Sequence, residues 1–316
     1  MLSFCIGTDT PKGYIKKAEC PRPTASQILV EIHACGLNFA DLLMIDGRYQ
    51  DTPALPFTPG LECAGRVIEV GSQISNFNIG DRVAIYGGKD GLAEFGAFDA
   101  ARAVQIPDAV SYEAAAASLI AYGTGLLALD TLAQLRSGET LLVTGAAGGV
   151  GLTAVELGKL LGARVIAQAR SAEKLAIAQA AGADHLIAGD EDLRAKVKEL
   201  GGADVVYETI GGETWTAAFR ATNPGGRLLP IGFASGEVPQ IPANHLLVKN
   251  LTVIGLYIGG LIQQRPELGQ KTFAKVMRWL AEGRITPHIS HMLPLSETHQ
   301  GLDLLRNRIA TGKVIM

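Results

Sequence analysis

The sequence predicts an α/β protein of two domains, and three observations carry this prediction. Residues 1–110 hold short apolar stretches separated by glycine and proline, a pattern typical of a small β-rich barrel. From about Ser111 onward strands and helices alternate, as in a doubly wound parallel sheet covered by helices on both faces. A chain of 316 residues, 47% of them apolar, can also bury two separate cores.

In the first domain, the alternating residues 27–34 predict a strand, and a turn then leads into a short helix that begins near Asn38. Residues 60–71 and 78–84 predict two more strand regions. Ser111 fits the N-cap of a helix that extends to residue 120.

The second domain is expected to alternate regularly. Strands are predicted at 141–143, 164–168, 183–187, 203–208, 227–232 and 251–257. Helices are predicted at 126–135, 152–161, 174–181, 192–200 and 214–222, and later at 268–282 and 297–309. A closing strand at 313–316 is expected to return to the first domain, because a lone helix and strand cannot bury themselves. The expected domains are therefore 1–118 with 259–316, and 119–258.

A glycine-rich turn follows the apolar run at 141–143 and reads Gly145-Ala146-Ala147-Gly148-Gly149-Val150-Gly151. A strand, a tight turn and a helix form the context in which such glycines bind a dinucleotide. The glycines let backbone N–H groups approach a pyrophosphate, and the helix N-terminus adds a partial positive charge. Ala146 stands where the G-x-G-x-x-G pattern has its first glycine. The sequence therefore predicts a dinucleotide-binding domain.

The end of the second strand in this domain indicates which dinucleotide binds. An NAD-binding domain normally carries Asp or Glu there, about 20 residues after the glycines. This chain has Arg170 and Ser171, with Lys174 one turn into the next helix. Basic side chains pair with a 2′-phosphate, and a serine hydroxyl adds a donor. The alternative is that Arg170 and Lys174 are ordinary surface charges. The position favours NADP(H).

Composition excludes several classes of function. A net charge of −3 without a basic block argues against nucleic acid or an anionic membrane surface as the main partner. No apolar run is long enough for a membrane span, and the first residues lack the pattern of a signal peptide. The four cysteines form no C-x-x-C pair, which favours reduced thiols and a cytoplasmic protein.

Several motifs together resemble the medium-chain dehydrogenase/reductase superfamily, and within it the zinc-free NADPH:quinone oxidoreductases related to zeta-crystallin. They span nearly the whole chain in family order: Gly36-Leu-Asn38-Phe-Ala-Asp41, Pro59-Gly-Leu-Glu62-Cys-Ala-Gly65, Gly80-Asp81-Arg82-Val83, Ala121-Tyr-Gly-Thr124, the glycine turn, Ala181-Gly-Ala-Asp184, Ile231-Gly-Phe233, Lys249-Asn250-Leu251 and Gly312-Lys313. The resemblance implies a GroES-like barrel as catalytic domain, a Rossmann domain and a homodimer.

The zinc-binding members of this superfamily differ at their metal ligands. A Cys ligand of theirs corresponds to Asn38 here, and a His ligand corresponds to Leu61. A catalytic zinc ion needs three protein ligands around an open position. The cysteine-rich lobe that binds structural zinc is also missing. His288 and His291 have no third ligand nearby in the sequence. We therefore expect no metal.

The resemblance also implies site residues. Asn38 and Thr124 would lie at the nicotinamide end of the cofactor, where they orient it or the acceptor oxygen, and Tyr49 would contact a quinone. Each has a structural alternative: Asn38 as a helix N-cap and Tyr49 as a loop aromatic, while Asp41 also fits a helix-start charge. The other expected cofactor contacts are Asp41, Gly145, Ala146, Gly148, Gly149, Val150, Gly151, Ile210, Gly232, Phe233, Leu256, Tyr257 and Lys313. A tyrosine that the family often has near the adenosine phosphate is Ala188 here, so Arg170, Ser171 and Lys174 must carry that site.

The chemistry expected from the resemblance is hydride transfer from NADPH to a quinone. Quinones and enones accept hydride without a Lewis-acid metal, so positioning and water exclusion supply most of the catalysis. Two alternatives remain open. The first is reduction of activated C=C bonds in enones, alkenals or enoyl thioesters. The second is a non-catalytic NADPH-binding protein with a structural or regulatory role.

Overall fold

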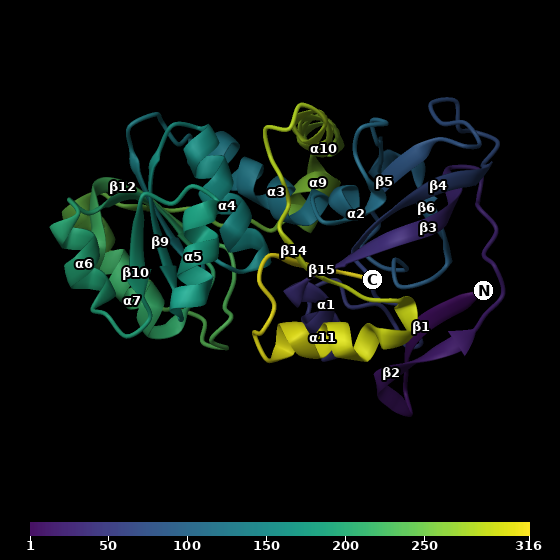
Figure 1. Ribbon diagram of the computed structural model, residues 1–316, viewed down its shortest axis with the longest axis horizontal. Coiled ribbons are helices and arrows are strands. Elements are labelled where there is room, and N and C mark those ends of the chain that lie inside the picture. The colour runs from purple at the N-terminus through teal and green to yellow at the C-terminus, as the bar shows by residue number, and fades with distance from the viewer. The chain divides into compact units, whose positions relative to one another are not determined.

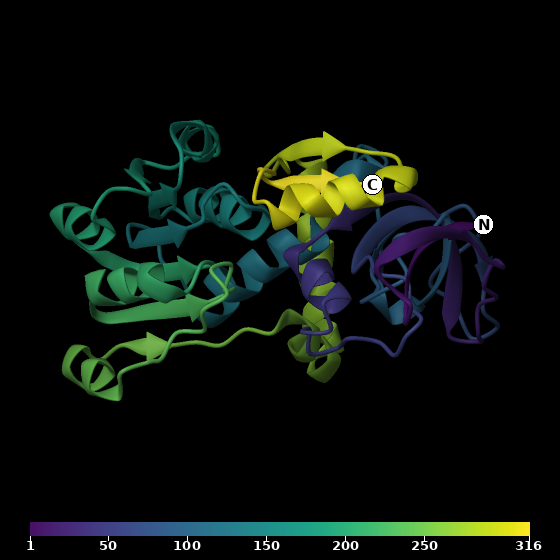
Figure 2. The same ribbon diagram turned by 90° about the horizontal axis from the view of Figure 1, so that it is seen from below.

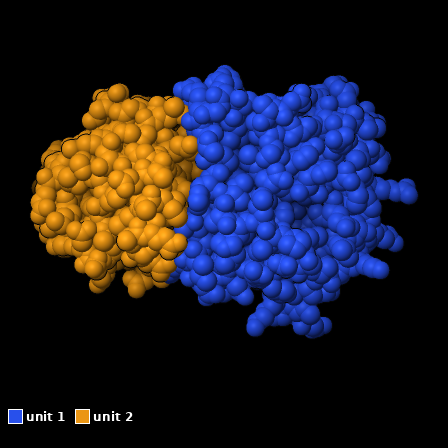
Figure 3. Space-filling view, in the orientation of Figure 1, with its two compact units in different colours: residues 1–123, 262–316 blue, residues 124–261 orange.

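The structure is a computed structural model that describes residues 1–316, and it divides into two compact units (Figure 3). Unit 1 consists of residues 1–123 and 262–316, and unit 2 of residues 124–261. The final strand, β15 (Lys313–Ile315), pairs antiparallel with β3 (Gln27–Leu37), which brings the end of the chain back to the first unit. None of the chain's helices combines the length and the apolar composition that a membrane-spanning helix requires.

Unit 1 is built on a seven-stranded sheet in the order β14-β15-β3-β4-β5-β7, with β6 also paired to β3 (Figure 1). The remaining strands of this sheet are β4 (Glu62–Val70), β5 (Arg82–Tyr86), β6 (Phe95–Asp99), β7 (Ala103–Gln105) and β14 (Ile289–Met292). All its pairings are antiparallel except that of β14 with β15. This confirms the predicted β-rich domain.

Further elements of unit 1 surround this sheet. They are the hairpin β1 (Leu2–Gly7) and β2 (Thr10–Lys17), and the helices α1 (Phe39–Ile45), α2 (Tyr112–Ala116), α10 (Pro266–Ala281) and α11 (Thr298–Arg306). As predicted, Ser111 caps α2, because its hydroxyl accepts a hydrogen bond from the Ala114 N–H at 3.1 Å. Figure 2 shows α11 beside α1, two helices in contact although far apart in the sequence.

Unit 2 contains a six-stranded, fully parallel sheet in the order β10-β9-β8-β11-β12-β13. Its strands are β8 (Thr140–Thr144), β9 (Arg164–Ala169), β10 (His185–Ala188), β11 (Ala203–Glu208), β12 (Thr222–Pro230) and β13 (Thr252–Val253). Its helices include α4 (Gly149–Leu160), α5 (Ala172–Ala180), α6 (Leu193–Glu199) and α7 (Gly212–Ala221). The strand order reverses between β8 and β11, and ligands of doubly wound sheets bind at such a switch point.

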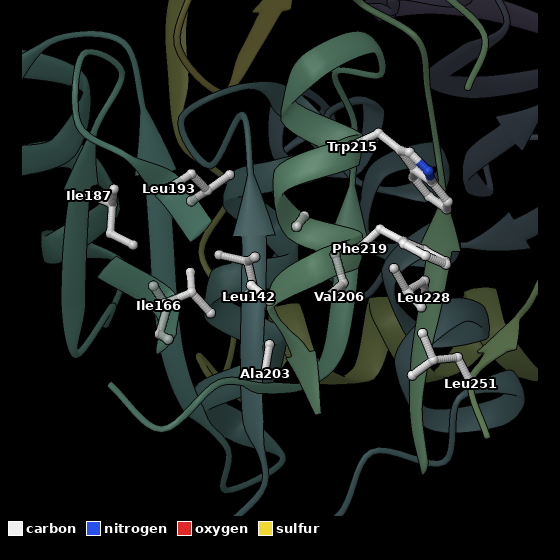
Figure 4. Close-up of a cluster of buried hydrophobic side chains, with 13 residues drawn as sticks. Leu142, Ile166, Ile187, Leu193, Ala203, Val206, Trp215, Phe219, Leu228 and Leu251 are labelled. Carbon is white, nitrogen blue, oxygen red and sulfur yellow. The ribbon is translucent and has the colours of Figure 1, made fainter. Parts of the chain in front are cut away.

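Apolar side chains of the parallel sheet and of two helices form the core of unit 2 (Figure 4). Leu142 and Val206 come from neighbouring central strands, and Trp215 and Phe219 come from α7. The two aromatic rings are stacked, with centroids 6.1 Å apart. This packing fixes the strand ends from which the glycine turn and its neighbouring loops project.

Several predicted boundaries were wrong. The helix after the glycine turn starts at Gly149 and not at residue 152, since two motif glycines form its first turn. The predicted helices at 111–120 and 126–135 are α2, then α3 (Leu119–Leu126) with a π-helical extension at Leu127–Leu132. The expected strand at 251–257 is limited to Thr252–Val253, because only these two residues pair with β12. Two helices were not predicted, α8 (Ala243–Lys249) after Pro242, and α9 (Ile258–Gln264).

Candidate active site

The glycine turn lies at the carboxyl end of β8. Gly145 has a φ of +60°, a left-handed conformation that favours glycine. A Cβ on Gly151 would overlap the carbonyl oxygen of Gly145, so close packing of helix and turn requires glycine there too. Gly148, the N-cap of α4, is exposed, and a Cβ there would meet only the Gly145 oxygen, at 3.4 Å. Open space in front of a helix N-terminus with unpaired N–H groups fits a pyrophosphate.

The surroundings of Ala146 explain how this turn accepts an alanine in place of the usual first glycine. Its side chain is completely buried, and its N–H donates to the Gln168 carbonyl oxygen at 3.0 Å. The methyl group therefore packs into the protein, while Gly149 and Val150, in the first turn of α4, are half-buried. Alanine in place of glycine at position 146 therefore leaves unchanged the side of the turn on which the first N–H groups of α4 lie.

A buried polar cluster joins the ends of β8 and β11 at the switch point. The Glu208 carboxylate is completely buried and accepts hydrogen bonds from the Thr144 hydroxyl at 3.0 Å and the Ile210 N–H at 2.9 Å. It also accepts from the Gly211 N–H at 2.9 Å. Burial raises the pKa of Glu208, and these hydrogen bonds lower it in part. The cluster holds the backbone of Ile210 next to the glycine turn.

The basic residues expected at a 2′-phosphate follow β9. Arg170 is exposed and comes directly after the last residue of the strand. Ser171 is the N-cap of α5, and its hydroxyl oxygen accepts from the Lys174 N–H at 3.4 Å. Ala188, at the end of β10, pairs in register with Ala169. Ala188, at the position where the family often has a tyrosine, is therefore on the strand beside the one that Arg170 follows.

The remaining expected cofactor contacts in unit 2 lie on irregular segments that follow β12 and β13. Gly232 and Phe233 follow β12, and the Phe233 side chain is 37% exposed. The Ala234 N–H donates to the Thr209 carbonyl oxygen at 3.1 Å, so this loop lies against the loop after β11. Leu256 and Tyr257 are half-buried and follow β13.

In unit 1, Asn38 lies at the N-cap of α1 and belongs to a cluster of three polar side chains with Glu62 and Lys313, which we call the Asn38 cluster. Glu62 is completely buried and Lys313 is 3% exposed. The Lys313 ammonium donates to Glu62 Oε1 at 2.8 Å and to Asn38 Oδ1 at 2.7 Å. Asn38 Nδ2 donates to Glu62 Oε1 at 3.0 Å. Asn38 is half-buried.

Asp41 is completely buried, and both its oxygens accept backbone hydrogen bonds. The donors are the N–H groups of Asn38 at 2.8 Å, Gly60 at 3.0 Å and Leu61 at 3.2 Å. Burial raises the pKa of Asp41 to about 6. Asp41 therefore fastens α1 to the 60–61 loop, and direct contact with a cofactor does not fit this burial. The same holds for Lys313, whose ammonium group is fully used inside the protein.

The two other expected catalytic residues differ in burial. Tyr49 is half-buried in the loop after α1, and its proximity contributes to the raised pKa of the buried Tyr86 hydroxyl, for which burial is the larger cause. Thr124 lies on α3 and is 6% exposed. The structure thus puts Asn38 and Tyr49 at the two ends of one short helix and its following turn.

No three His, Cys, Asp or Glu side chains in the structure are arranged to hold a metal ion. His288 Nε2 lies 3.0 Å from the Thr311 hydroxyl, and His291 Nδ1 lies 3.0 Å from the Ser290 hydroxyl. Leu61, at the position of a histidine ligand, is buried.

Sequence reasoning missed the roles of Glu62 and Thr144. Glu62 begins β4 and Thr144 ends β8, and both side chains are completely buried. For Glu62, a carboxylate at the start of a strand with apolar residues was the available signal, because buried charges need partners. The neutral Thr144 hydroxyl carries no such signal.

Comparisons with known proteins agree with this architecture. Family models match at residues 24–108, described as the alcohol dehydrogenase GroES-like domain, and at 149–282, described as zinc-binding dehydrogenase. Quinone oxidoreductase-like protein 2 homolog of Nematostella vectensis is 41% identical over 297 residues, which are 92% of this chain and 81% of the relative. The Bos taurus quinone oxidoreductase-like protein 2 is 39% identical over 302 residues, 94% of this chain and 86% of the relative.

Among solved structures, Escherichia coli quinone oxidoreductase complexed with NADPH superposes with a TM-score of 0.92 at 28% identity. The match covers 100% of this chain and 99% of that one. The superposition covers the whole chain, the two relatives cover 92% and 94% of it, and the family models match residues 24–108 and 149–282. The protein therefore belongs to the quinone oxidoreductase family of the medium-chain dehydrogenase/reductase superfamily.

Proposed function

We propose that this protein is an NADPH-dependent oxidoreductase that transfers hydride from NADPH to a quinone without zinc. One observation carries the proposal: a glycine turn at the switch point of the parallel sheet is combined with basic residues, in place of an acid, after the next strand. The solved relative from Escherichia coli was crystallised with NADPH.

In this proposal, residues of unit 2 bind the cofactor. The N–H groups of Gly149, Val150 and Gly151 bind the pyrophosphate. Arg170 and Lys174 pair with the 2′-phosphate, and the Ser171 hydroxyl still has its hydrogen to donate. When bound, the cofactor supplies a hydride from its nicotinamide ring.

The residues proposed for the reacting end of the cofactor position it and exclude water. Ile210, Gly232, Phe233, Leu256 and Tyr257 offer backbone and apolar surface to a flat ring. The proposed catalytic residues are Asn38, Tyr49 and Thr124. Positioning of two reactants can supply most of such an acceleration, since no bond to the protein has to form.

Zinc independence is supported by the Asn38 cluster. A lysine ammonium lies 2.7 Å from Asn38 Oδ1 and 2.8 Å from Glu62 Oε1. Both side chains are therefore already bound to a cation that the chain itself provides. A zinc ion next to them would be repelled by Lys313 and would lack a nitrogen or sulfur ligand from residues 38 and 61.

A panel of acceptors tests the function. NADPH oxidation is followed with 1,4-benzoquinone, 9,10-phenanthrenequinone, a linear enone and an enoyl thioester, with EDTA present and NADH as control donor. We expect turnover with the quinones, preference for NADPH and no effect of EDTA. Turnover with enones alone would replace the quinone proposal by that of a double-bond reductase. Tight NADPH binding without turnover on any acceptor would refute the enzymatic proposal.

We also propose a cytoplasmic homodimer. Strand β13 lies at the edge of the parallel sheet, where unpaired backbone groups can pair with a second copy. Helix α8 precedes it, and its Leu247 and Val248 side chains are 78% and 75% exposed. Light scattering should give twice the mass of 33.2 kDa, and Leu247→Glu combined with Val248→Glu should give the monomer. A monomeric wild type at micromolar concentration would contradict this proposal.

The four free cysteines favour the cytoplasm.

A further inference from the structure

Two strands of unit 2 end side by side at the switch point, and the last residue of each is polar. The final backbone pairing between β8 and β11 joins Val143 to Tyr207, so Thr144 and Glu208 occupy the next position in the same register. Both side chains are completely buried. Beyond the last backbone pairing, these two side chains are what remains to hold the strand ends together.

A chain of hydrogen bonds joins the two strand ends. The Thr209 N–H donates to Thr144 Oγ1 at 3.1 Å, and the Thr144 hydroxyl donates to Glu208 Oε1 at 3.0 Å. The Thr209 hydroxyl donates back to the Thr144 carbonyl oxygen at 2.9 Å. The Glu208 carboxylate also accepts from the N–H groups of Ile210 and Gly211, each at 2.9 Å. We call the side chains of Thr144, Glu208 and Thr209 the Glu208 relay.

The relay requires an ionised carboxylate. Every hydrogen-bond partner of Glu208 is a donor, so a protonated carboxyl group would direct its own hydrogen at one of these donors. None of the ion pairs in the structure includes Glu208, whereas the equally buried Glu62 pairs with Lys313. Its charge is therefore balanced by N–H and O–H dipoles that come from both strand ends. Removal of either the charge or the Thr144 hydroxyl breaks the connection.

The relay reaches two neighbouring segments. A Cβ built on Gly145 would lie 2.4 Å from the Thr209 hydroxyl and 3.4 Å from Ile210 Cγ1, so this segment lies directly against the first residue of the glycine turn. On the other side, the Glu208 carbonyl oxygen accepts from the Ile231 N–H at 2.7 Å. Glu208 thus connects the glycine turn, the segment after β11 and the loop after β12, which are three of the segments proposed to bind the cofactor.

The relay also determines what the segment after β11 offers to a ligand. Its three consecutive N–H groups, at residues 209–211, all donate to the side chains of Thr144 and Glu208. They are not available to a pyrophosphate, in contrast to the first N–H groups of α4. The anion is then bound by α4, and the segment after β11 contributes the half-buried side chain of Ile210.

We propose that Glu208 and Thr144 are positioning residues that hold the glycine turn and the segment after β11 at the separation that the cofactor requires. This inference rests on the proposed function for the identity of the ligand. Neither side chain touches the cofactor, because both are buried and act through the backbone of Gly145 and of residues 209–211. A hydrogen bond to a charged group corresponds to roughly 10- to 150-fold in an equilibrium constant, so loss of either side chain should weaken cofactor binding at least tenfold.

Hydrogen exchange, followed by NMR of backbone amides in the full-length protein without ligand, tests the relay itself. The amides of Thr209, Ile210 and Gly211 should exchange at least about 100-fold more slowly than that of the exposed Val238. Thr144→Val should speed exchange at Thr209 at least tenfold. Glu208→Gln should do the same at Gly211, because the new amide group would face that N–H. Exchange at residues 209–211 as fast as at Val238 in wild type would overturn the relay.

The dissociation constant of NADP⁺, measured by calorimetry, tests the positioning role. It should rise at least tenfold in Thr144→Val and in Glu208→Gln, and Thr144→Ser, which keeps the hydroxyl, should stay within threefold of wild type. Glu139→Gln is the matched control, because Glu139 lies at the opposite end of β8 and pairs with Arg227 at 2.6 Å. It should lower Tm and leave the dissociation constant within threefold.

An unchanged dissociation constant in folded Thr144→Val would overturn the positioning role, and this variant stays informative if Glu208→Gln does not fold. An equal loss of binding in Glu139→Gln would also overturn it, because any weakening of unit 2 would then have the same effect. The double variant of Thr144 and Glu208 should bind at most about threefold more weakly than the weaker single variant, since both act through one hydrogen bond. The expected exchange and binding in a protein without quinone turnover would refute the proposed function alone.

Discussion

Reversal of the charge at Arg170 tests the basis of cofactor selection. Arg170 follows β9 directly and is exposed, so Arg170→Glu should leave the fold intact. A hydrogen bond to a charged group contributes about 1.5–3 kcal/mol, which corresponds to roughly 10- to 150-fold in affinity. Repulsion between the new carboxylate and a 2′-phosphate adds about 1 kcal/mol per pair of charges near 4 Å in water. We therefore expect KM for NADPH to rise at least tenfold.

The assay is the initial rate of NADPH or NADH oxidation with a saturating quinone. KM for NADH should change at most about threefold, because NADH has no 2′-phosphate, and higher salt should reduce the difference through screening. Arg220→Glu, at an exposed position on α7, is the matched control and should leave both values unchanged. An unchanged KM for NADPH in Arg170→Glu would remove Arg170 from the site.

Three further predictions concern the turn, a buried carboxyl and the core. Gly151→Ala should weaken NADPH binding at least tenfold and lower Tm, because its Cβ would overlap the Gly145 oxygen. Gly148→Ala should weaken NADPH binding and leave Tm unchanged. A lower Tm in Gly148→Ala together with an unchanged Tm in Gly151→Ala would contradict this geometry. The pKa of Asp41 is raised from 3.8 to about 6, so the native state binds this proton more tightly and loses up to ~3 kcal/mol of stability as pH rises from about 4 to 6. The Tm of wild type minus that of Asp41→Asn should fall over this window, and a constant difference would argue against the raised pKa. Phe219→Ala should cost about 3–5 kcal/mol in urea unfolding, since its side chain is 3% exposed; a loss under 1 kcal/mol would contradict its core position.

The fold was largely predictable because its signals are local. Alternating apolar residues, glycine turns and helix caps such as Ser111 act within a few residues. The start of α4 was misplaced because Gly149 and Gly151 are poor helix formers, and for Gly151 it is the close packing against the Gly145 backbone that requires glycine. The short length of β13 was also not predictable, because it depends on how far the segment pairs with Arg227 and Leu228 of β12.

The candidate site was predictable where one segment carries it, as in the glycine turn and at Arg170, Ser171 and Lys174. It was not predictable where distant segments meet. Asn38 and Lys313 are 275 positions apart, and no local pattern indicates that one orients the other. In the sequence, Asp41 resembled a charge at the start of a helix. Two of its three backbone donors are the N–H groups of Gly60 and Leu61, which are 19 and 20 positions away. Long-range pairing of buried polar groups needs the folded chain.

The most direct test of the central claim is a single-turnover measurement with zinc-depleted protein. Protein treated with a chelator, with its metal content measured, is mixed rapidly with NADPH and 1,4-benzoquinone, and the reaction is repeated with NADPH deuterated at the transferred position. Direct hydride transfer without zinc predicts full conversion of one NADPH to one hydroquinone and a rate at least twofold lower with the deuterated cofactor. No conversion until zinc is added back would contradict the account.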